Sequence, residues 1–448
     1  MKTTLQRSRV AFRILAWLLF VFLVVTTSVA QALPTLWNGQ PATIIENAAG
    51  GSGLTRNNPI LIKDAAELAY FAKQVNAGGI LLAVTHGTSI DNTKTSSYDS
   101  GFDRYHFALS ADINLNGHDW VPIGQFENSF SGHFDGAGHV VKGLKISIQS
   151  TTSNYVYAGL FGQVWNGTIR NLGVWLAPEG ITASLSQGSI YAGGLVGHMS
   201  GWKTFAGIRN CYVESETNGA VSITGTRIKE AYAGGIVGYV STLFGGSCLL
   251  THCYATVDVE AKMSGSNSNV YAGGITGGGR YTEKVTVSYT YATGKVEGNG
   301  TNDVYTGGIC GNQDRGTIAY NLALNKSISC TSTGGGEYIN RIVGKTNNAI
   351  LTSNYATSCM KLNGQPVASR GTNNTAGTDI GFDTFETALK SNLSTNNEWT
   401  EAWLWTNGLL PKLKKFNINN GVSSGKLAGQ VDHSKKDFLT SKALLPIF

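Results

Sequence analysis

Short runs in which apolar and small residues alternate recur along the chain and predict β-strands. Residues 191–197 read Tyr-Ala-Gly-Gly-Leu-Val-Gly, and alternate side chains of a strand point to opposite faces. The odd-numbered positions, from Tyr191 to Gly197, would therefore share one face. Equivalent runs carry Leu or Ile at the position of Leu195, so we expect this face to point into the core. The column consists of Leu195, Ile236, Ile275, Ile309 and Ile342.

The same run returns at intervals that are too regular for an ordinary domain. Its copies occupy residues 157–162, 191–197, 232–238, 271–277, 305–311 and 338–344, and their last glycines are 35, 41, 39, 34 and 33 residues apart. A second anchor lies inside each period, at residues 171–174, 210–213, 252–255, 289–292, 320–323 and 353–356. Anchors that persist while the spacing varies indicate fixed strands with variable corner loops.

Periods of this length are typical of solenoids and propellers. Stacked coils repeat one register and place like residues over like, so we predict an all-β solenoid, namely a right-handed parallel β-helix. The alternative is a β-propeller, whose blades usually take about 40–45 residues, and several of the repeats here are shorter.

One amphipathic helix is expected, at residues 64–77. Asp64 and Glu67 have the spacing of a capping box, and Gly78 can end the helix. Leu68, Phe71, Ala72 and Val75 then fall on one helical face. Because a bare terminal coil would expose apolar core and unpaired backbone, we interpret residues 33–143 as an N-terminal cap followed by the first coils.

The first 32 residues have the features of a secretory signal peptide. Four basic residues precede an apolar run at 14–25, and the small residues Ala30 and Ala32 form a cleavage site. Cleavage would reduce the net charge from +6 to about +2, which does not favour nucleic acid as a partner. No second membrane segment is apparent. Charged residues make up 14% of the chain and there are 57 glycines, which fits an exported all-β protein.

Two further segments carry a resemblance to a known family. Residues 120–124 read Trp-Val-Pro-Ile-Gly, and residues 134–139 read Phe-Asp-Gly-Ala-Gly-His, ahead of the repeated Gly-Gly-Leu-Val-Gly. With these features the chain resembles the GLUG-motif proteins of bacteria over residues 55–415. Those are exported or surface proteins, and the motif also occurs beside the protease domains of IgA-specific metallopeptidases. The resemblance implies export and often adhesion, and it brings no catalytic residue set.

This resemblance divides the rest of the chain. Residues 144–360 would be the GLUG-type repeats, residues 361–416 a C-terminal segment that closes the β domain, and residues 417–448 a flexible or truncated tail. The expected location is secreted or on the outer face of a bacterial cell, and the residues do not indicate an oligomeric state.

Metal and cofactor chemistry finds little support in the sequence. A zincin needs His-Glu-x-x-His on a helix, and the eight histidines are scattered. No Cys-x-x-Cys pair suggests zinc, so neither a metal nor a cofactor is expected. Cys211 and Cys253 hold equivalent positions in successive repeats. Stacked coils would bring them near disulfide distance, although both also suit small core positions.

Large aromatic residues after the glycine anchors are the candidate ligand-binding residues. If the loops leave one corner of successive coils, they form an edge suited to stacking on sugars or docking a cell-surface protein. The alternative is that they fold back and cover the sheet corner. The set is Trp165, Trp202, Phe205, Tyr239, Phe244 and Tyr281.

The best acidic pair is Glu260 and Glu297, which would be neighbours in adjacent coils. Paired carboxylates could serve a β-helix polysaccharide lyase or hydrolase, but a solvated outer face also explains them. No convincing catalytic constellation accompanies the pair. The sequence therefore favours an adhesin-like binding protein for glycans or cell-surface ligands, with the enzyme and a non-catalytic structural stalk as alternatives.

Overall fold

The computed structural model describes residues 36–47, 51–78, 105–215, 217–265, 267–279, 284–367, 374–380, 402–404 and 410–414, and the backbone at 81–82 and 90–91. The chain divides into the units Met1–Trp37 and Asn38–Phe448, and the structure below is that of the second. The predicted signal peptide and the tail at 417–448 lie outside the described residues, as does Tyr281. The described residues contain no helix that is long and apolar enough to cross a bilayer.

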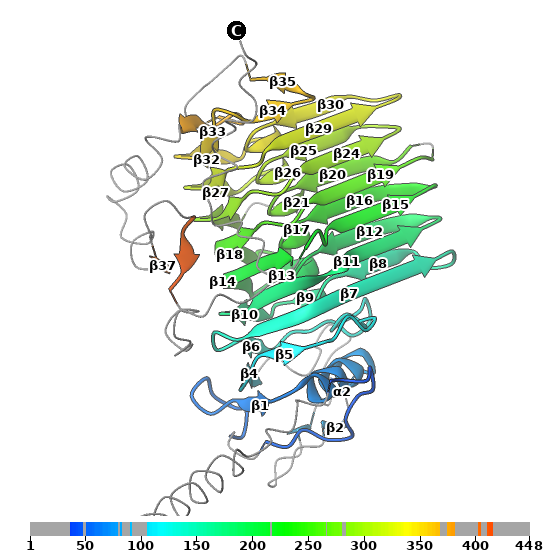
Figure 1. Cartoon of the computed structure of the whole chain (residues 1–448), viewed down its shortest axis with the longest axis vertical. Coiled ribbons are helices and arrows are strands. Elements are labelled where there is room, and N and C mark those ends of the chain that lie inside the picture. The colour runs from blue at the N-terminus through cyan, green and yellow to red at the C-terminus, as the bar shows by residue number, and fades with distance from the viewer. Residues whose placement is uncertain are drawn as a thin grey trace, which may run out of the picture. The chain divides into compact units, whose positions relative to one another are not determined.

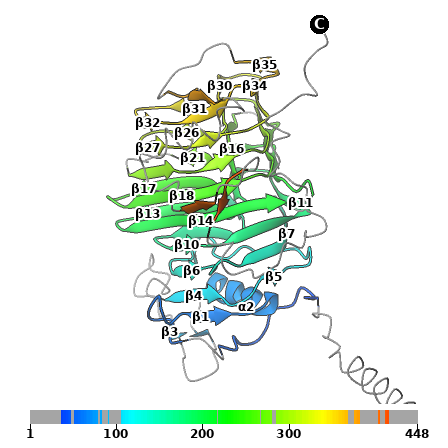
Figure 2. The ribbon, with the colours of Figure 1, turned by 60° about the vertical axis from the view of Figure 1, so that its left-hand side comes forward.

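Three parallel sheets make up the body of the molecule (Figures 1 and 2). One six-stranded sheet consists of β8 Tyr155–Ala158, β12 Gly188–Gly193, β16 Ile228–Gly234, β20 Asn269–Gly273, β25 Val304–Gly307 and β30 Glu337–Asn340. The other consists of β9 Phe161–Trp165, β13 Val196–Trp202, β17 Val237–Leu243, β21 Thr276–Gly279, β26 Cys310–Gln313 and β31 Val343–Thr346.

The third sheet joins strands from every coil. It contains β1 Ile60–Ile62, β4 His106–Leu109, β5 Ile113–Asn114, β6 His133–Asp135, β7 Val140–Ser150, β10 Thr168–Arg170, β11 Gly173–Leu185, β14 Phe205–Ser215, β15 Val221–Gly225, β18 Ser247–Ala255, β19 Val259–Met263, β22 Val285–Ser288, β23 Tyr291–Ala292, β24 Val296–Gly300, β27 Thr317–Ala319, β28 Leu322–Ala323, β29 Ser327–Ser332, β32 Ile350–Thr352, β33 Tyr355–Thr357, β34 Lys361–Leu362, β35 Gln365–Pro366 and β36 Thr378–Ile380. Two small hairpins complete the described strands, β2 Leu81–Leu82 with β3 Ile90–Asp91, and β37 Trp403–Leu404 with β38 Lys412–Leu413.

Successive repeats pair strand on strand in a nearly unshifted register, which makes this a parallel β-helix. Tyr191 is opposite Tyr232, Tyr232 is opposite Tyr271, and Tyr271 is opposite Tyr305. The propeller alternative is wrong, because each blade of a propeller pairs strands within one repeat. The predicted Leu/Ile column is confirmed. All five side chains are fully buried, and backbone hydrogen bonds join Leu195 to Ile236 and Ile236 to Ile275.

The Gly-Gly pair creates a sharp bend rather than a continuous strand. β12 ends at Gly193 and β13 begins at Val196, so strict alternation across residues 191–197 does not hold. Thr306 faces the inside of the coil, because a Cβ added at Gly298 of the opposite sheet would lie 2.5 Å from its Cγ2. The neighbouring Tyr305 therefore points outward, while the Leu/Ile column points inward.

The second glycine of each pair faces the second anchor of the same repeat across the coil interior. A Cβ added at Gly235 would lie 2.5 Å from the Cβ of Ala255 and 2.2 Å from the carbonyl oxygen of Gly274. A Cβ added at Gly194 would likewise lie 2.5 Å from Cγ1 of Val213. The two sequence anchors are therefore packing partners, and any larger side chain at the glycine would separate the sheets.

The first residue of each second anchor adopts a left-handed backbone and forms another corner. The φ angles are 51° at Asn171, 53° at Asn210, 52° at His252, 55° at Tyr289 and 59° at Tyr320. Asparagine tolerates this conformation, whereas bulky residues rarely adopt it. The rings of His252 and Tyr289 stack 5.0 Å apart and those of Tyr289 and Tyr320 stack 5.1 Å apart, which offsets part of the strain.

Helix α2 Ala65–Asn76 lies at the N-terminal end of the β-helix, as expected for the cap (Figure 1). The Asp64 carboxylate accepts the backbone N–H of Glu67 at 2.9 Å. The reciprocal bond of a capping box is replaced, because the Glu67 carboxylate accepts the backbone N–H groups of Glu46 and Lys63. Phe71, on the buried face, packs against Phe107 and Phe130.

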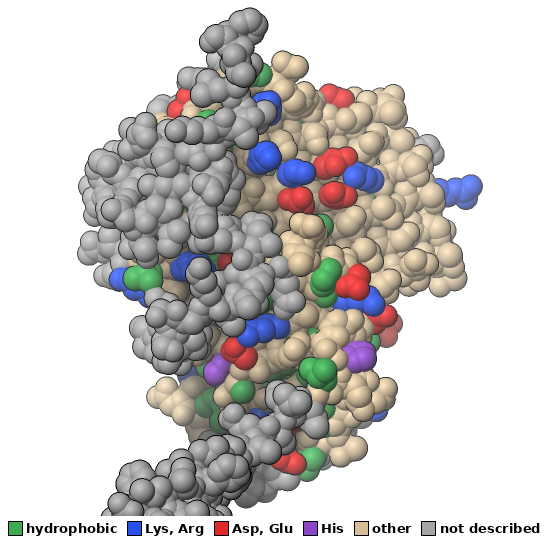
Figure 3. Space-filling view, in the orientation of Figure 1, with side chains coloured by type: hydrophobic (Ala, Val, Ile, Leu, Met, Phe, Trp, Pro, Cys, Tyr) green, Lys and Arg blue, Asp and Glu red, His purple; other side chains and the backbone are tan. Residues whose placement is uncertain are grey.

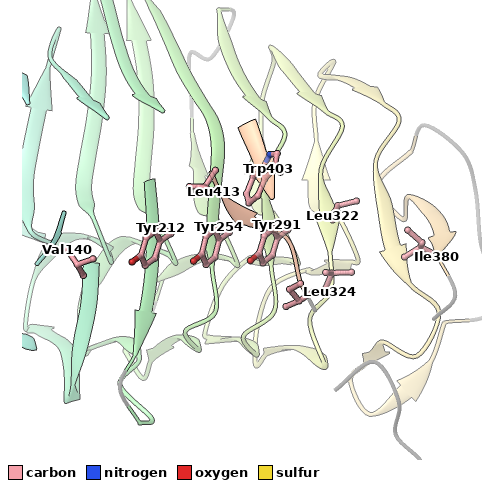
Figure 4. Packing of buried hydrophobic residues seen from close by; sticks show 10 residues of the cluster. Val140, Tyr212, Tyr254, Tyr291, Leu322, Leu324, Ile380, Trp403 and Leu413 are labelled. Atoms are coloured by element: carbon pink, nitrogen blue, oxygen red, sulfur yellow. The ribbon is translucent and has the colours of Figure 1, made fainter. Parts of the chain in front are cut away.

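The described residues of the C-terminal segment occupy two places. β34 and β36 pair with β29 and β33 at the end of the long sheet, and the β37–β38 hairpin lies along the flank of the coils. Trp403 of β37 contacts the stacked rings of Tyr254 and Tyr291, and the Tyr291 hydroxyl donates to the carbonyl oxygen of Pro411 at 2.9 Å (Figure 4). This hairpin covers an outward-facing column of tyrosines in the middle coils.

Cys211 and Cys253 face each other in adjacent coils as free, buried thiols. Burial raises the pKa of the Cys211 thiol well above its ordinary value. At neutral pH these thiols behave as small core side chains, in line with the non-disulfide interpretation.

A chain of buried polar side chains crosses four coils beneath the outer surface. Ser129 donates to Gln163, Gln163 donates to Nδ1 of His198 at 2.9 Å, and Nε2 of His198 donates to Ser241 at 2.9 Å. This pattern requires a neutral imidazole, since Nδ1 must accept. Burial lowers the pKa of His198 to about 3.

We predict that Gly235→Ala destabilises the protein by about 1–3 kcal/mol, because the new methyl group would overlap the Gly274 carbonyl and Ala255. Urea denaturation of the purified variant measures this effect. Thr224→Ala, on an exposed position of β15, is the control and should change stability by less than about 0.5 kcal/mol. Equal stability of the two variants would contradict the packing described for this corner.

We also predict a pH dependence that originates from His198. Its folded pKa of about 3 lies below the unfolded value of about 6.5, so the unfolded chain binds the additional proton and stability falls as the pH drops from about 6.5 toward 3. Between pH 7 and pH 5 the wild-type protein should lose about 2 kcal/mol more than His198→Gln. Parallel urea denaturation curves at both pH values test this, and identical losses would show that the imidazole is not buried in its neutral form.

Candidate functional site

The candidate site lies where the sheet of β9, β13, β17, β21, β26 and β31 turns into the long sheet (Figure 2). Trp165 ends β9, Trp202 ends β13, and Phe244 follows β17. The rings of Trp165 and Trp202 are 5.4 Å apart, and those of Trp202 and Phe244 are 4.4 Å apart. We call these three residues the aromatic strip. Phe244 is 71% exposed and the two tryptophans are half-buried, so the strip presents ring surface to solvent.

The other predicted aromatic residues do not join this strip. Phe205 begins β14 and is 44% exposed, and its ring covers Gly207, where an added Cβ would lie 2.6 Å away. Tyr239 lies within β17, where it packs 5.1 Å from Tyr191 and 4.5 Å from Tyr232. Phe205 thus follows the fold-back interpretation in part, and Tyr239 packs against the tyrosine column described below.

A shallow hollow of about 310 Å³ adjoins the exposed end of the strip. Phe244 forms one wall, and Lys284, Asp314 and Arg315 supply charged groups. The Lys284 ammonium donates to the carbonyl oxygen of Gly245 at 3.1 Å, which holds it beside the Phe244 turn. An aromatic face next to hydrogen-bonding groups is an arrangement that suits a saccharide.

A column of outward-facing tyrosines follows the bend between the two six-stranded sheets. The rings of Tyr157, Tyr191, Tyr232, Tyr271, Tyr305 and Tyr338 stack in this order, with centroids 5.4, 5.6, 4.2, 4.8 and 4.7 Å apart. The column is faced by one residue from each of the strands β13, β17, β21, β26 and β31 of the second six-stranded sheet. In order along the coils these residues are His198, Tyr239, Gly278, Asn312 and Lys345.

These facing residues fill the bend in the early coils and leave it open in the later ones. His198 and Tyr239 pack on the tyrosine rings, whereas Gly278 has no side chain. A second hollow of about 530 Å³ follows, with Tyr305, Asn312, Asp314 and Lys345 among its lining residues. Asp314 borders both hollows, so they are adjacent.

Sequence reasoning did not find this second hollow. In the sequence, the hollow corresponds to a change at one repeated position. Tyr239 is replaced by Gly278 in the next coil, and Asn312 and Lys345 occupy the same position in the two coils after that. Those changes can be recognised only once the register of the coils is known.

The acidic pair shares one lysine. Glu260 and Glu297 are opposite each other in β19 and β24, and the Lys262 ammonium lies 3.0 Å from one carboxylate and 3.2 Å from the other. Burial lowers the pKa of Lys262 and the hydrogen bonds to both glutamates raise it by more, so its pKa lies above the ordinary value. All three side chains are partly exposed, so the group has the form of an ion-pair cluster on a solvated outer face.

Charged groups elsewhere on the visible face are also interleaved. Figure 3 shows acidic and basic side chains side by side on a surface that is mainly uncharged. Among the described residues, no group of three or more His, Cys, Asp or Glu side chains is placed to hold a metal ion.

Comparison with known proteins relates the chain to others chiefly through its fold. No protein-family model matches the chain. One solved structure, described as a putative immunoglobulin A1 protease from Bacteroides ovatus, superposes with a TM-score of 0.54 at 20% identity and covers 83% of this chain and 97% of that one. One protein of Evansella cellulosilytica, named as a putative Gly-rich membrane protein, is 34% identical over 145 residues. That match spans 30% of this chain and 13% of the relative. The structural match supports the β-helix fold.

Proposed function

We propose that this chain is an exported bacterial β-helix protein of the GLUG type, whose aromatic strip binds glycans at a cell surface. The observation that carries the proposal is the strip itself, in which the tilted rings of Trp165, Trp202 and Phe244 contact one another across successive coils and Phe244 remains 71% exposed. Exposed large aromatic side chains that a rigid scaffold aligns are costly in water unless they meet a ligand.

The scaffold supports a binding function in two further ways. The two tryptophans lie on strands in parallel register, with Trp165 opposite Ser200 and Trp202 opposite Leu243, so the backbone that carries them is already ordered before a ligand binds. The backbone N–H of Trp202 donates to the Asn166 side chain at 2.6 Å, which ties the end of β13 to the turn that follows Trp165 in the preceding coil. Sugar rings can pack on the aromatic faces while the hollow beside Phe244 supplies polar partners.

Export and surface location rest on other observations. A basic stretch, an apolar run and a small-residue cleavage site begin the chain. A bacterial relative is named as a membrane protein, in agreement with a location at or beyond the cell envelope. Binding to a cell-surface protein and a purely structural role are the other outcomes that the test below can give.

We predict that Trp202→Ala combined with Phe244→Ala weakens glycan binding at least about ten-fold, because the stacking surface is removed. The protein without residues 1–32 is applied to a glycan array, and affinities for the glycans that bind are then measured by calorimetry.

The control is Phe126→Ala, which removes another exposed phenylalanine that stacks on Tyr155 outside the strip. It should bind like the wild type, and circular dichroism should show β structure in all variants. If the strip variant binds as tightly as the control, or if no glycan on the array binds, the proposed function is refuted.

A further inference from the structure

The hollow at the open end of the tyrosine column has the features of a second ligand subsite. Its volume of about 530 Å³ falls in the range of about 300–1,000 Å³ that is usual for small-molecule sites. It combines aromatic surface from Tyr271 and Tyr305 with polar groups from Asn312, Asp314 and Lys345. A hollow of mixed ring and hydrogen-bonding character is suited to a sugar residue.

The hollow is open because the residue that follows Tyr239 in the next coil is a glycine, Gly278. Tyr239 fills the bend against Tyr191 and Tyr232, and the next residue along the column is Gly278. An added Cβ at Gly278 would lie 2.1 Å from the carbonyl oxygen of Asn312, and its φ is 132°, so the backbone itself requires glycine here. The opening is therefore built into the path of the chain.

Lys345 gives the hollow its charge. Its ammonium lies 3.8 Å from the ring centroid of Tyr338 and 5.6 Å from that of Tyr305, which fixes it over the aromatic column. It has no carboxylate partner among the described residues. The Tyr305 hydroxyl donates to Asp303 at 2.9 Å, and the Asn347 side chain donates to Asp314 at 3.0 Å, so both nearby carboxylates already accept hydrogen bonds.

Positive charge extends into the neighbouring hollow. Lys284 and Arg315 line that hollow and Lys345 lines this one, whereas Asp314 is the one acidic residue that the two share. An extended saccharide that stacks on Phe244 would pass Lys284 and Arg315 before it reaches Lys345. Cations along such a path favour an acidic ligand over a neutral one.

We propose that the hollow beside Lys345 is a subsite for an acidic sugar residue, whose carboxylate or sulfate pairs with the Lys345 ammonium. This assignment rests on the proposed glycan-binding function and specifies the class of glycan. The edges of the stacked Tyr271 and Tyr305 rings border the sugar, and Asn312 and Asp314 hydrogen-bond to its hydroxyl groups.

The test compares acidic oligosaccharides with neutral counterparts of the same backbone. Oligogalacturonates are measured beside their carboxyl-reduced forms, and sulfated galactans beside their desulfated forms, by calorimetry with the protein without residues 1–32. The wild type should prefer one acidic form, and the pair that shows the preference identifies the carboxylate or the sulfate as the recognised group. Lys345→Gln should weaken binding of that form about five-fold and leave the neutral form unchanged.

Two variants separate a specific contact from general attraction. Lys229→Gln removes the same charge from an exposed position on β16 and should keep the preference, and Lys345→Arg should retain most of it. If Lys345→Gln keeps the preference, or Lys229→Gln loses it equally, the subsite is refuted.

The two proposals fail in different ways. If neutral and acidic forms bind equally and binding depends on Trp202 and Phe244, the glycan-binding function stands and the acidic subsite falls. If the acidic preference depends on Lys345 but not on the aromatic strip, the subsite stands and the strip is not the binding surface. Absence of binding to every oligosaccharide refutes both.

Discussion

Parallel backbone hydrogen bonds join each coil to the next with almost no shift in register, and this constraint places every residue over its counterpart in the following repeat. Tyr191, Tyr232 and Tyr271 are stacked for this reason, and so are the inward-facing Leu195 and Ile236. A residue that fits its own coil must also fit the two coils beside it. The repeat therefore retains glycine where sheets meet and aromatic rings where they stack in an outward-facing column.

The same constraint explains where function can arise. While the columns repeat, the surface is filled, as His198 and Tyr239 fill the bend beside the tyrosines. When a column changes, space or charge appears at a defined place, as at Gly278 and Lys345. A solenoid can thus acquire a binding site through single departures from its own repeat, with the neighbouring coils as a rigid support.

Covering elements complete the surface that the coils leave exposed. The β37–β38 hairpin lies on the tyrosines of the long sheet, where Trp403 contacts Tyr254 and Tyr291. Among the described residues, the column that includes Tyr305 and Tyr338 has no such cover at its later end, where the larger hollow lies. The two tyrosine columns therefore differ in role. The one that contains Tyr254 and Tyr291 is covered by the β37–β38 hairpin, and the one that contains Tyr305 and Tyr338 borders the larger hollow.

The amino-acid sequence by itself determined the repeat, the all-β class, the buried Leu/Ile column and the helix that begins after Asp64, because these follow from local spacing and from like residues recurring at one period. It also named Trp165, Trp202 and Phe244, since large aromatics after a glycine anchor are visible in a linear reading. Only the tertiary structure decided that Tyr239 leaves this group, that Lys262 forms ion pairs with both Glu260 and Glu297, and that Lys345 lines a hollow near Gly278. The physical reason is that loop lengths differ between repeats, so neighbours across coils are fixed by hydrogen-bond register and by the bend at each Gly-Gly pair rather than by distance along the chain.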